Sequence, residues 1–170
     1  MGKGICKGYY LLQKSHIQTT MRLIIQRVKN ASVHIEGKIH ASIGQGMLIL
    51  LGIEPGDTME DIEWSCGKTA RLRIFDDQNH VMNLSIQDIK GSFLIVSQFT
   101  LFASTQKGNR PSYIRAATPE IAVPLYEKFV ETLIRTTQLP VKTGVFGANM
   151  QLELINDGPV TIIMNSKNKE

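Results

Sequence analysis

Apolar residues recur along most of this chain at the spacing of strands, and in two stretches at the spacing of helices. Residues 22–28 and 32–36 alternate between apolar and polar positions, which predicts two strands. A two-residue turn at 37–38 is expected to lead into a third strand over 39–43. Residues 47–53 are almost wholly apolar, as is typical of a strand buried on both faces. The first third of the chain therefore predicts a sheet.

The two stretches with helical spacing lie further along. Asp57 is a candidate N-cap, with Glu60 three residues later in capping-box register, and apolar residues then recur at helical spacing. A second helix is expected from about Pro119, and Pro140 is expected to end it. Pro124 marks either the true start of this helix or a kink, because proline cannot donate an interior hydrogen bond.

The remaining strands lie between and after the helices. Residues 93–96 form a second wholly apolar strand, and 150–155 and 160–164 predict two closing strands around a tight turn at 156–159. Residues 104–115 are expected to form a loop. The order of strands, helix, strand, helix and strands predicts one α+β or mixed α/β domain.

Composition narrows the class of protein. A chain of 170 residues, 42% hydrophobic and 20% charged, is typical of one globular domain. Its longest apolar run, residues 47–51, is far shorter than the roughly 18 residues of a membrane-spanning helix. Cys6 and Cys66 are too few for a disulfide scaffold or a structural zinc site. A reduced, cytoplasmic protein without a membrane partner is the simplest interpretation.

The net charge of +4 is concentrated at the start of the chain. Residues 1–20 hold three lysines and no acidic residue, which leaves 16 basic against 15 acidic residues in the rest. The body is nearly neutral, so overall charge is a weak argument for a polyanionic partner. The leader lacks a long apolar stretch and has no arginine, so we expect a disordered extension or an upstream start; an organelle address is the alternative.

The familiar catalytic constellations are absent from the sequence. The four histidines are not spaced with cysteine or acidic residues as metal ligands would be, and there is no G-x-S-x-G or P-loop motif. The spacing of these residues therefore disfavours a metal site. A Ser-His-Asp triad stays open, because its members can lie far apart in sequence.

Three segments remain as candidates for chemistry. Residues 97–101 bring hydroxyls and an amide to the end of a buried strand, where sites are common. Residues 156–161 place glycine and proline in a turn that can aim main-chain oxygens at a ligand. Residues 107–112 carry cations that can position phosphates. Each has an ordinary alternative: satisfied backbone groups at a strand end, a plain hairpin turn, and a solvated loop.

Together these segments resemble the D-aminoacyl-tRNA deacylase family, whose signature motifs are S-Q-F-T-L and N-x-G-P-V-T. Both motifs are intact, as residues 97–101 and 156–161, and residues 21–28, 107–112 and 143–150 also look like the family. Either motif alone would be weak, but two intact motifs in the right order make the match specific.

The resemblance implies an architecture. It implies a single α/β domain in which mixed sheets form a barrel-like core, packed with two main helices in three α/β/β layers. This domain would span residues 21–166, between an extension over 1–20 and a C-terminal tail over 167–170. The family works as a homodimer with its sites at the interface, and it needs no metal or organic cofactor.

The resemblance also implies an activity, which is chiral proofreading in translation. The family hydrolyses the ester that joins a D-amino acid, or glycine mischarged on alanine tRNA, to the 3′-terminal adenosine of tRNA. Gly158 and Pro159, joined by a cis peptide in the family, would enter the partner subunit's site. There their carbonyls would meet the α-amino group and exclude L side chains, and Arg27 would help to hold the motif.

The pocket itself would come from the first motif, through Ser97, Gln98, Phe99 and Thr100. Main-chain N–H groups near Phe99 and Thr100 would face the scissile carbonyl. One mechanism makes Thr100 the nucleophile, although no adjacent base is evident to activate it. The mechanism that we favour relies on orientation and oxyanion stabilisation, with the tRNA 2′-hydroxyl helping to activate water. Contacts to the terminal adenosine would come from Phe146, Gly147, Ala148 and Met150.

Two other classes of protein remain as alternatives. A non-catalytic RNA-binding module would use the cationic loop, but it does not account for a rigid Gly-Pro turn beside a hydroxyl-bearing strand end. A metal hydrolase is disfavoured by the scattered histidines.

Overall fold

The computed structural model describes residues 20–168 and is built around one long strand, β1 (Arg22–Ile35). It pairs antiparallel with β2 (Lys38–Ile43), β3 (Gly46–Gly52) and β8 (Gln151–Asn165). Residues 1–19 of the predicted extension lie outside the described residues. Because three strands pair with β1, this one strand holds most of the sheet together.

The sheet continues in parallel from β3. Strand β6 (Ser92–Ser97) pairs with β3, and β7 (Val141–Thr143) pairs with β6, which completes a six-stranded mixed sheet. A short hairpin of β4 (Phe75–Asp76) and β5 (Met82–Leu84) stands apart from it.

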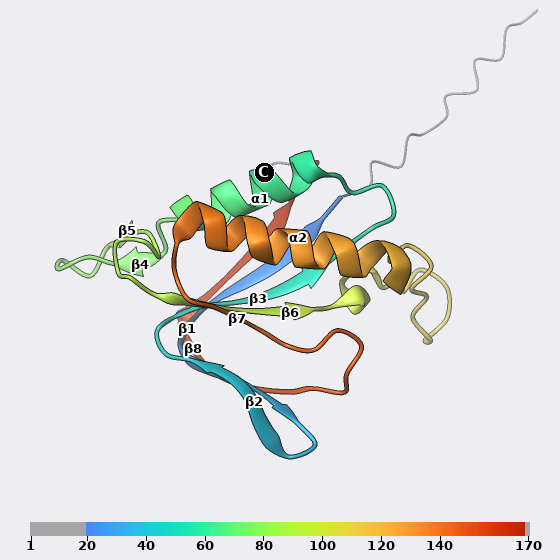
Figure 1. The fold of residues 1–170 in the computed structure, drawn as a ribbon, viewed down its shortest axis with the longest axis horizontal. Coiled ribbons are helices and arrows are strands. Elements are labelled where there is room, and N and C mark those ends of the chain that lie inside the picture. Colours follow the sequence, from blue (N-terminus) through green and yellow to red (C-terminus); the bar gives the residue numbers. More distant parts are fainter. Residues whose placement is uncertain (1–19, 169–170) are drawn as a thin grey trace, which may run out of the picture.

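Two helices cover one side of the sheet (Figure 1). Helix α1 (Met59–Arg71) and helix α2 (Pro119–Thr137) pack side by side above it, and the sheet bends away below them into a barrel-like layer. The predicted single α/β domain with a barrel-like sheet and two main helices is confirmed. No described helix is long and apolar enough to cross a membrane.

The strand predicted in two pieces, 22–28 and 32–36, is one continuous strand. Met21, Leu23 and Ile25 face the core under the helices, whereas Val28, Ala31 and Val33 face the second core inside the bent sheet. The pairing of β1 with β8 shifts register on both sides of Val28. The break in alternation at 29–30 therefore marks a change of buried face, not an end of the strand.

The prediction of a closing hairpin around residues 156–159 is wrong. Strand β8 runs unbroken from Gln151 to Asn165, and its irregularity lies opposite the shift in β1. The other turn prediction is displaced by one residue: Glu36 and Gly37, with φ of 51° and 75°, connect β1 to β2. Positive φ at both positions is the geometry that a two-residue hairpin requires.

The helix ends differ slightly from the predicted ones. Thr58, not Asp57, caps α1, and the Asp61 carboxylate accepts hydrogen bonds from the Thr58 N–H at 2.9 Å and hydroxyl at 2.8 Å. Helix α2 does begin at Pro119, so Pro124 lies inside it. It ends at Thr137, before Pro140, where Gln138 turns left-handed with φ of 55°.

Buried carboxylates gather where the described chain begins. Glu54 accepts the Thr20 N–H at 2.7 Å and pairs with Arg115 at 2.7 Å, and Asp61 pairs with Lys167 at 2.9 Å. Asp57 accepts the Glu54 N–H, but its Oδ1 has no hydrogen-bond partner among the described residues. Burial raises the pKa of Asp57 from an ordinary 3.8 to about 7.

This raised pKa makes stability depend on pH. Between about pH 4 and 7 the folded protein keeps a proton on Asp57 that the unfolded chain releases, so the free energy of unfolding falls as pH rises. Asp57→Asn removes that decline. We expect the stability of the variant relative to wild type to rise by about 2–4 kcal/mol between pH 4.5 and 7.5, measured by urea denaturation. A difference that does not change with pH would contradict the assignment.

Candidate functional site

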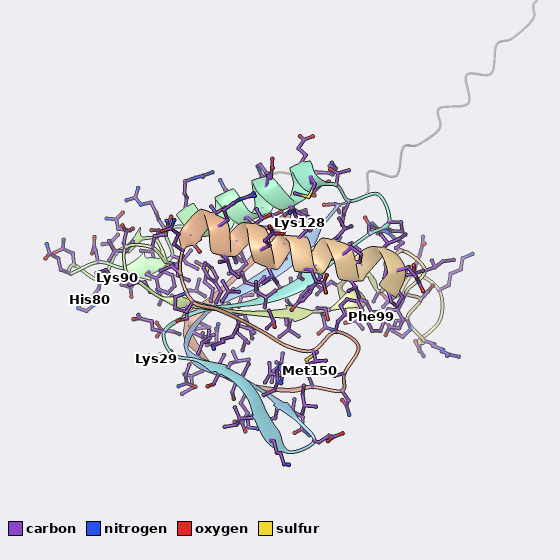
Figure 2. All side chains as sticks on the ribbon, in the orientation of Figure 1. Lys29, His80, Lys90, Phe99, Lys128 and Met150 are labelled. Carbon is purple, nitrogen blue, oxygen red and sulfur yellow. The ribbon has the colours of Figure 1, made fainter. Side chains whose placement is uncertain are left out.

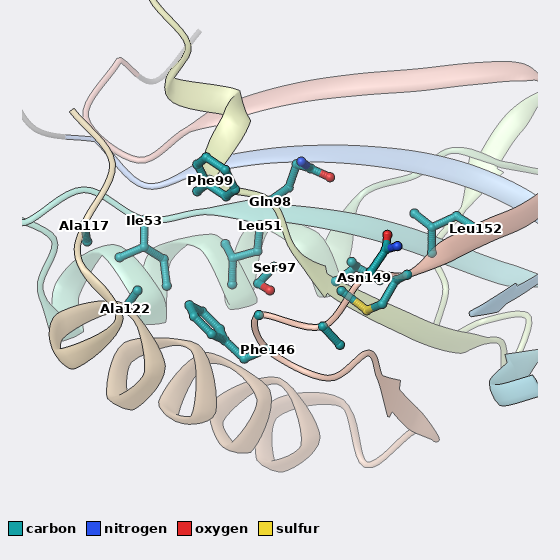
Figure 3. Close-up of a pocket in the computed structure, with 14 residues that line it drawn as sticks. Leu51, Ile53, Ser97, Gln98, Phe99, Ala117, Ala122, Phe146, Asn149 and Leu152 are labelled. Atoms are coloured by element: carbon teal, nitrogen blue, oxygen red, sulfur yellow. The ribbon is translucent and has the colours of Figure 1, made fainter. Parts of the chain in front are cut away.

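A pocket of about 300 Å³ opens at the end of β6 (Figure 3). Its volume lies at the lower end of the range for small-molecule sites. It brings together most of the residues that the sequence singled out from two distant segments: Ser97, Gln98 and Phe99 on one side, and Phe146, Gly147, Ala148 and Met150 on the other.

The first side of the pocket is set by the sheet. Ser97 is the last residue of β6 and lies opposite Leu51 of β3 in the parallel pairing. The Gln98 N–H donates to the Leu51 carbonyl at 2.8 Å, and the chain then leaves the sheet as a short 3-10 helix, η1 (Phe99–Phe102). The side chain of Gln98 donates to Thr100 Oγ1 at 2.5 Å. Thr100 itself is half-buried and does not line the pocket.

The second side is a loop that is tied back to the same strand. The Gly144 N–H donates to the Ile95 carbonyl at 3.0 Å, and Tyr126 Oη of α2 donates to that carbonyl at 2.8 Å. Phe146 packs edge-on against the Tyr126 ring, with the two ring centroids 6.1 Å apart. Burial raises the pKa of Tyr126, so its hydroxyl keeps the proton that it donates. One carbonyl of β6 thus positions both the loop and the helix around the pocket.

The remaining predicted residues form a separate cluster at the irregularity of β8. Arg27 Nε donates to the Asp157 carbonyl at 3.0 Å, and Nη1 donates to the Ile74 carbonyl at 2.7 Å. Its guanidinium also pairs with the Asp76 and Asp157 carboxylates at 3.1 and 3.2 Å. Because Arg27 is only 5% exposed, these bonds hold the segment before Gly158 in place without competition from water.

The irregular segment of β8 around Gly158 and Pro159, called the turn below, requires glycine at its centre. Gly158 has φ of 122°, and a Cβ there would lie 2.8 Å from Val160 Cγ2 and 3.1 Å from Arg27 Nη2. The Asn156 side chain donates to the Arg27 and Val160 carbonyls at 3.2 and 3.0 Å and so bridges the irregularity. The peptide between Gly158 and Pro159 is cis, and both residues are exposed.

Within one chain the pocket and the turn do not share a cavity. Neither Gly158, Pro159 nor Arg27 lines the pocket. Figure 2 shows Lys29, which pairs with the Asp157 carboxylate at 3.7 Å, well apart from Phe99 and Met150. The structure thus brings the predicted residues together as two groups rather than one.

The pocket wall carries no ionisable side chain. Among residues 20–168 there is also no group of three or more histidine, cysteine or acidic side chains that could hold a metal. Burial raises the pKa of the Cys66 thiol to about 12, as suits a core residue rather than a nucleophile. The polar groups that line the pocket are main-chain groups, the Ser97 hydroxyl and the Gln98 and Asn149 amides.

Sequence reasoning missed part of the lining. The missed residues are apolar except for Asn149, and they come from β3 and the residue after it, from β6 and β8, and from the segments around the start of α2 and before β8: Leu51, Ile53, Val96, Ala117, Ala122, Asn149 and Leu152. Nothing in their spacing separates them from ordinary core residues, because a wall is recognised only when the facing segment is known. Only Asn149 could have been found, since it lies inside the segment 143–150.

Comparisons with known proteins decide the family. The sequence profile described as D-Tyr-tRNA(Tyr) deacylase matches residues 24–165. The chain belongs to this family. Its predicted membership and its classification as a hydrolase are confirmed.

Individual relatives agree with this assignment. A D-aminoacyl-tRNA deacylase of Bacteroides thetaiotaomicron is 61% identical, and one of Flavobacterium johnsoniae is 57% identical; each match covers 88% of this chain and all of the relative. A solved structure described as c-Myc DNA Unwinding Element Binding Protein is 40% identical. It superposes with a TM-score of 0.79 over 84% of this chain and 97% of that one.

The buried position of Arg27 leads to a prediction with a control on the same strand. Arg27→Ala leaves the Asp157 and Ile74 carbonyls without their donor, and we expect the free energy of unfolding to fall by about 2–4 kcal/mol. Lys29→Ala removes an exposed partner of the same Asp157 carboxylate and should change it by less than about 0.5 kcal/mol. Urea denaturation of both variants checks this, and equal losses would contradict it.

Proposed function

We propose that this chain hydrolyses the ester bond of D-aminoacyl-tRNA in the cytoplasm, releasing the free D-amino acid and tRNA. Glycyl-tRNA mischarged on alanine tRNA is proposed as a further substrate. The observation that carries the proposal is the pocket, in which residues of the S-Q-F-T-L motif and of the segment 146–150 face each other across a space without ionisable groups.

The proposed substrate divides between the two sides of the pocket. The terminal adenosine packs against Phe146 and Met150, with Gly147 and Ala148 allowing the backbone to approach it closely. The aminoacyl ester lies toward Ser97 and Phe99. A neutral wall suits a substrate whose reacting ester is uncharged.

The reaction in this proposal needs no protein nucleophile. Water attacks the ester carbonyl, and its proton passes through the ribose 2′-hydroxyl to the 3′-oxygen as the bond between the carbonyl carbon and that oxygen breaks. The N–H groups of Phe99 and Thr100 open a 3-10 helix, where donors lack a partner in the preceding turn, and they stabilise the oxyanion. Thr100 acts as a positioning residue, because its hydroxyl oxygen already accepts the Gln98 amide and no base among residues 20–168 is hydrogen-bonded to it.

Chiral selection is assigned to the exposed turn of a second subunit. Gly158 and Pro159 lie outside their own chain's pocket, so in a homodimer with sites at the interface they are free to enter the partner's pocket. Their carbonyls then accept hydrogen bonds from the substrate's α-amino group and leave no room for an L side chain. Arg27 positions this turn through its bond to the Asp157 carbonyl.

The direct test is hydrolysis of matched D-Tyr-tRNA and L-Tyr-tRNA. We expect the D-ester to be cleaved at least about a hundredfold faster than the L-ester, because steric exclusion and loss of the amino-group contacts together cost more than 2.7 kcal/mol. The rate should be unchanged in excess chelator. A rate no faster than spontaneous hydrolysis would favour an RNA-binding module, and loss of activity with chelator would favour a metal hydrolase.

Subunit mixing tests whether turn and pocket come from different chains. Ala148→Trp fills the pocket and Gly158→Ala distorts the turn, so we expect each homodimer to lose D-Tyr-tRNA hydrolysis. After the two variants are unfolded together and refolded in equal amounts, half the dimers are mixed and each holds one intact site. Activity should therefore return to about one quarter of wild type. No recovery in verified mixed dimers would place the turn and pocket of one site on the same chain.

A further inference from the structure

We propose that Phe99 and Tyr113 form a stacking platform for the nucleotide that precedes the terminal adenosine of the tRNA. This inference rests on the proposed function and extends the site beyond the pocket. The platform is a second binding site beside the pocket. It binds single-stranded RNA by stacking rather than by base-specific hydrogen bonds.

The two rings meet at the rim of the pocket. Phe99 lines the pocket, yet 55% of it is exposed, and Tyr113 packs edge-on against it with ring centroids 5.0 Å apart. An edge-to-face pair leaves most of its ring faces uncovered by the partner ring. Tyr113 is 39% exposed, so the pair presents aromatic surface to solvent at the rim of the pocket.

The segment that carries Tyr113 is fixed at its base. Ser104 and Ser112 exchange backbone hydrogen bonds at 2.8 and 2.9 Å. On the C-terminal side of Tyr113, Arg115 pairs with the buried Glu54, and the Ala117 N–H donates to the Ile53 carbonyl at 2.9 Å. Tyr113 therefore stands between two anchored points, and an organised ring loses less entropy on stacking than one on a free loop.

The charge beside the platform suits a polyanion. The segment 104–118 contains Lys107, Arg110 and Arg115 and no acidic residue. Arg115 is paired with Glu54, whereas Lys107 and Arg110 are exposed and take part in no ion pair within the described part of the chain. Two free cations next to two exposed rings are the elements that hold single-stranded nucleic acid, through phosphate contacts and stacked bases.

A protein partner is the other occupant that an exposed aromatic patch suggests. Ile114 is 89% exposed beside Tyr113 and would suit such a contact. The cations favour RNA, because an unbalanced pair of cations would need acidic partners at a protein interface, whereas RNA supplies a phosphate at every nucleotide. RNA also continues from the adenosine that the pocket is proposed to hold.

The experiment compares two substrates that differ only in the upstream nucleotides. D-Tyr-tRNA contains them, whereas D-Tyr-adenosine lacks them. We expect Tyr113→Ala to raise KM for D-Tyr-tRNA by about tenfold or more, with a much smaller change on D-Tyr-adenosine. Tyr113→Phe keeps the ring and should restore KM to within about twofold of wild type. The matched control is Val81→Ala. Val81 is an exposed apolar residue that follows His80 in the sequence, and Figure 2 shows His80 at the opposite end of the molecule from Phe99.

Two kinetic outcomes would overturn the platform. An equal loss on both substrates would mean that Tyr113 only supports Phe99, and no loss on either would mean that the ring faces another partner, such as a protein. If wild type hydrolyses neither substrate, the proposed function fails, and binding of a short RNA ending in C-C-A is measured instead by fluorescence anisotropy. A tenfold weaker complex with Tyr113→Ala then supports the platform, and unchanged affinity overturns it.

Discussion

Arg27 is a buried cation at the point where the long strand β1 changes the face that it buries. A guanidinium in such a place must satisfy its donors from the protein, and it does so with the carbonyls of Asp157 and Ile74 and two carboxylates. These bonds connect β1 to β8 and to the segment that follows α1. The irregular turn of β8 exists because the regular ladder gives way there to side-chain bonds from Arg27 and Asn156. The conformation of this turn thus depends on hydrogen bonds with Arg27 of the opposite strand.

This dependence explains which parts of the fold could be read from the sequence. The fully buried strands β3 and β6, the start of α2 at Pro119 and the two-helix α/β layout follow from apolar spacing and proline chemistry. The continuity of β1 and of β8 could not be read in this way. A change of buried face and a glycine-proline pair both imitate the end of a strand, and only their mutual pairing shows that each strand continues. Asp57 and Thr58 are both favourable N-cap residues. The Asp57 carboxylate accepts the backbone N–H of Glu54, and Thr58 is the residue that caps the helix.

The candidate site divides in the same manner. Its members were found from two intact motifs, but motifs do not show whether residues meet within one chain. The segment 146–150 lies beside Ser97, Gln98 and Phe99 because the Gly144 N–H and the Tyr126 hydroxyl both donate to the Ile95 carbonyl, and these bonds join distant parts of the sequence. The turn at Gly158 lies outside the pocket and is exposed, and the buried Arg27 holds the residue that precedes it. In the proposed function, this exposed segment acts on the pocket of a partner subunit.

The neutral pocket wall has a consequence for substrate range. A binding surface without ionisable side chains presents the same potential to an acidic, a basic or an apolar amino acid, so it neither attracts nor repels a ligand by the charge of its side chain. In the proposed function, discrimination falls to the arrangement of atoms around the α-carbon, which all amino acids have in common. The same proposal then lets one protein serve many different aminoacyl-tRNAs, because the recognition that it assigns is of handedness and not of chemical identity.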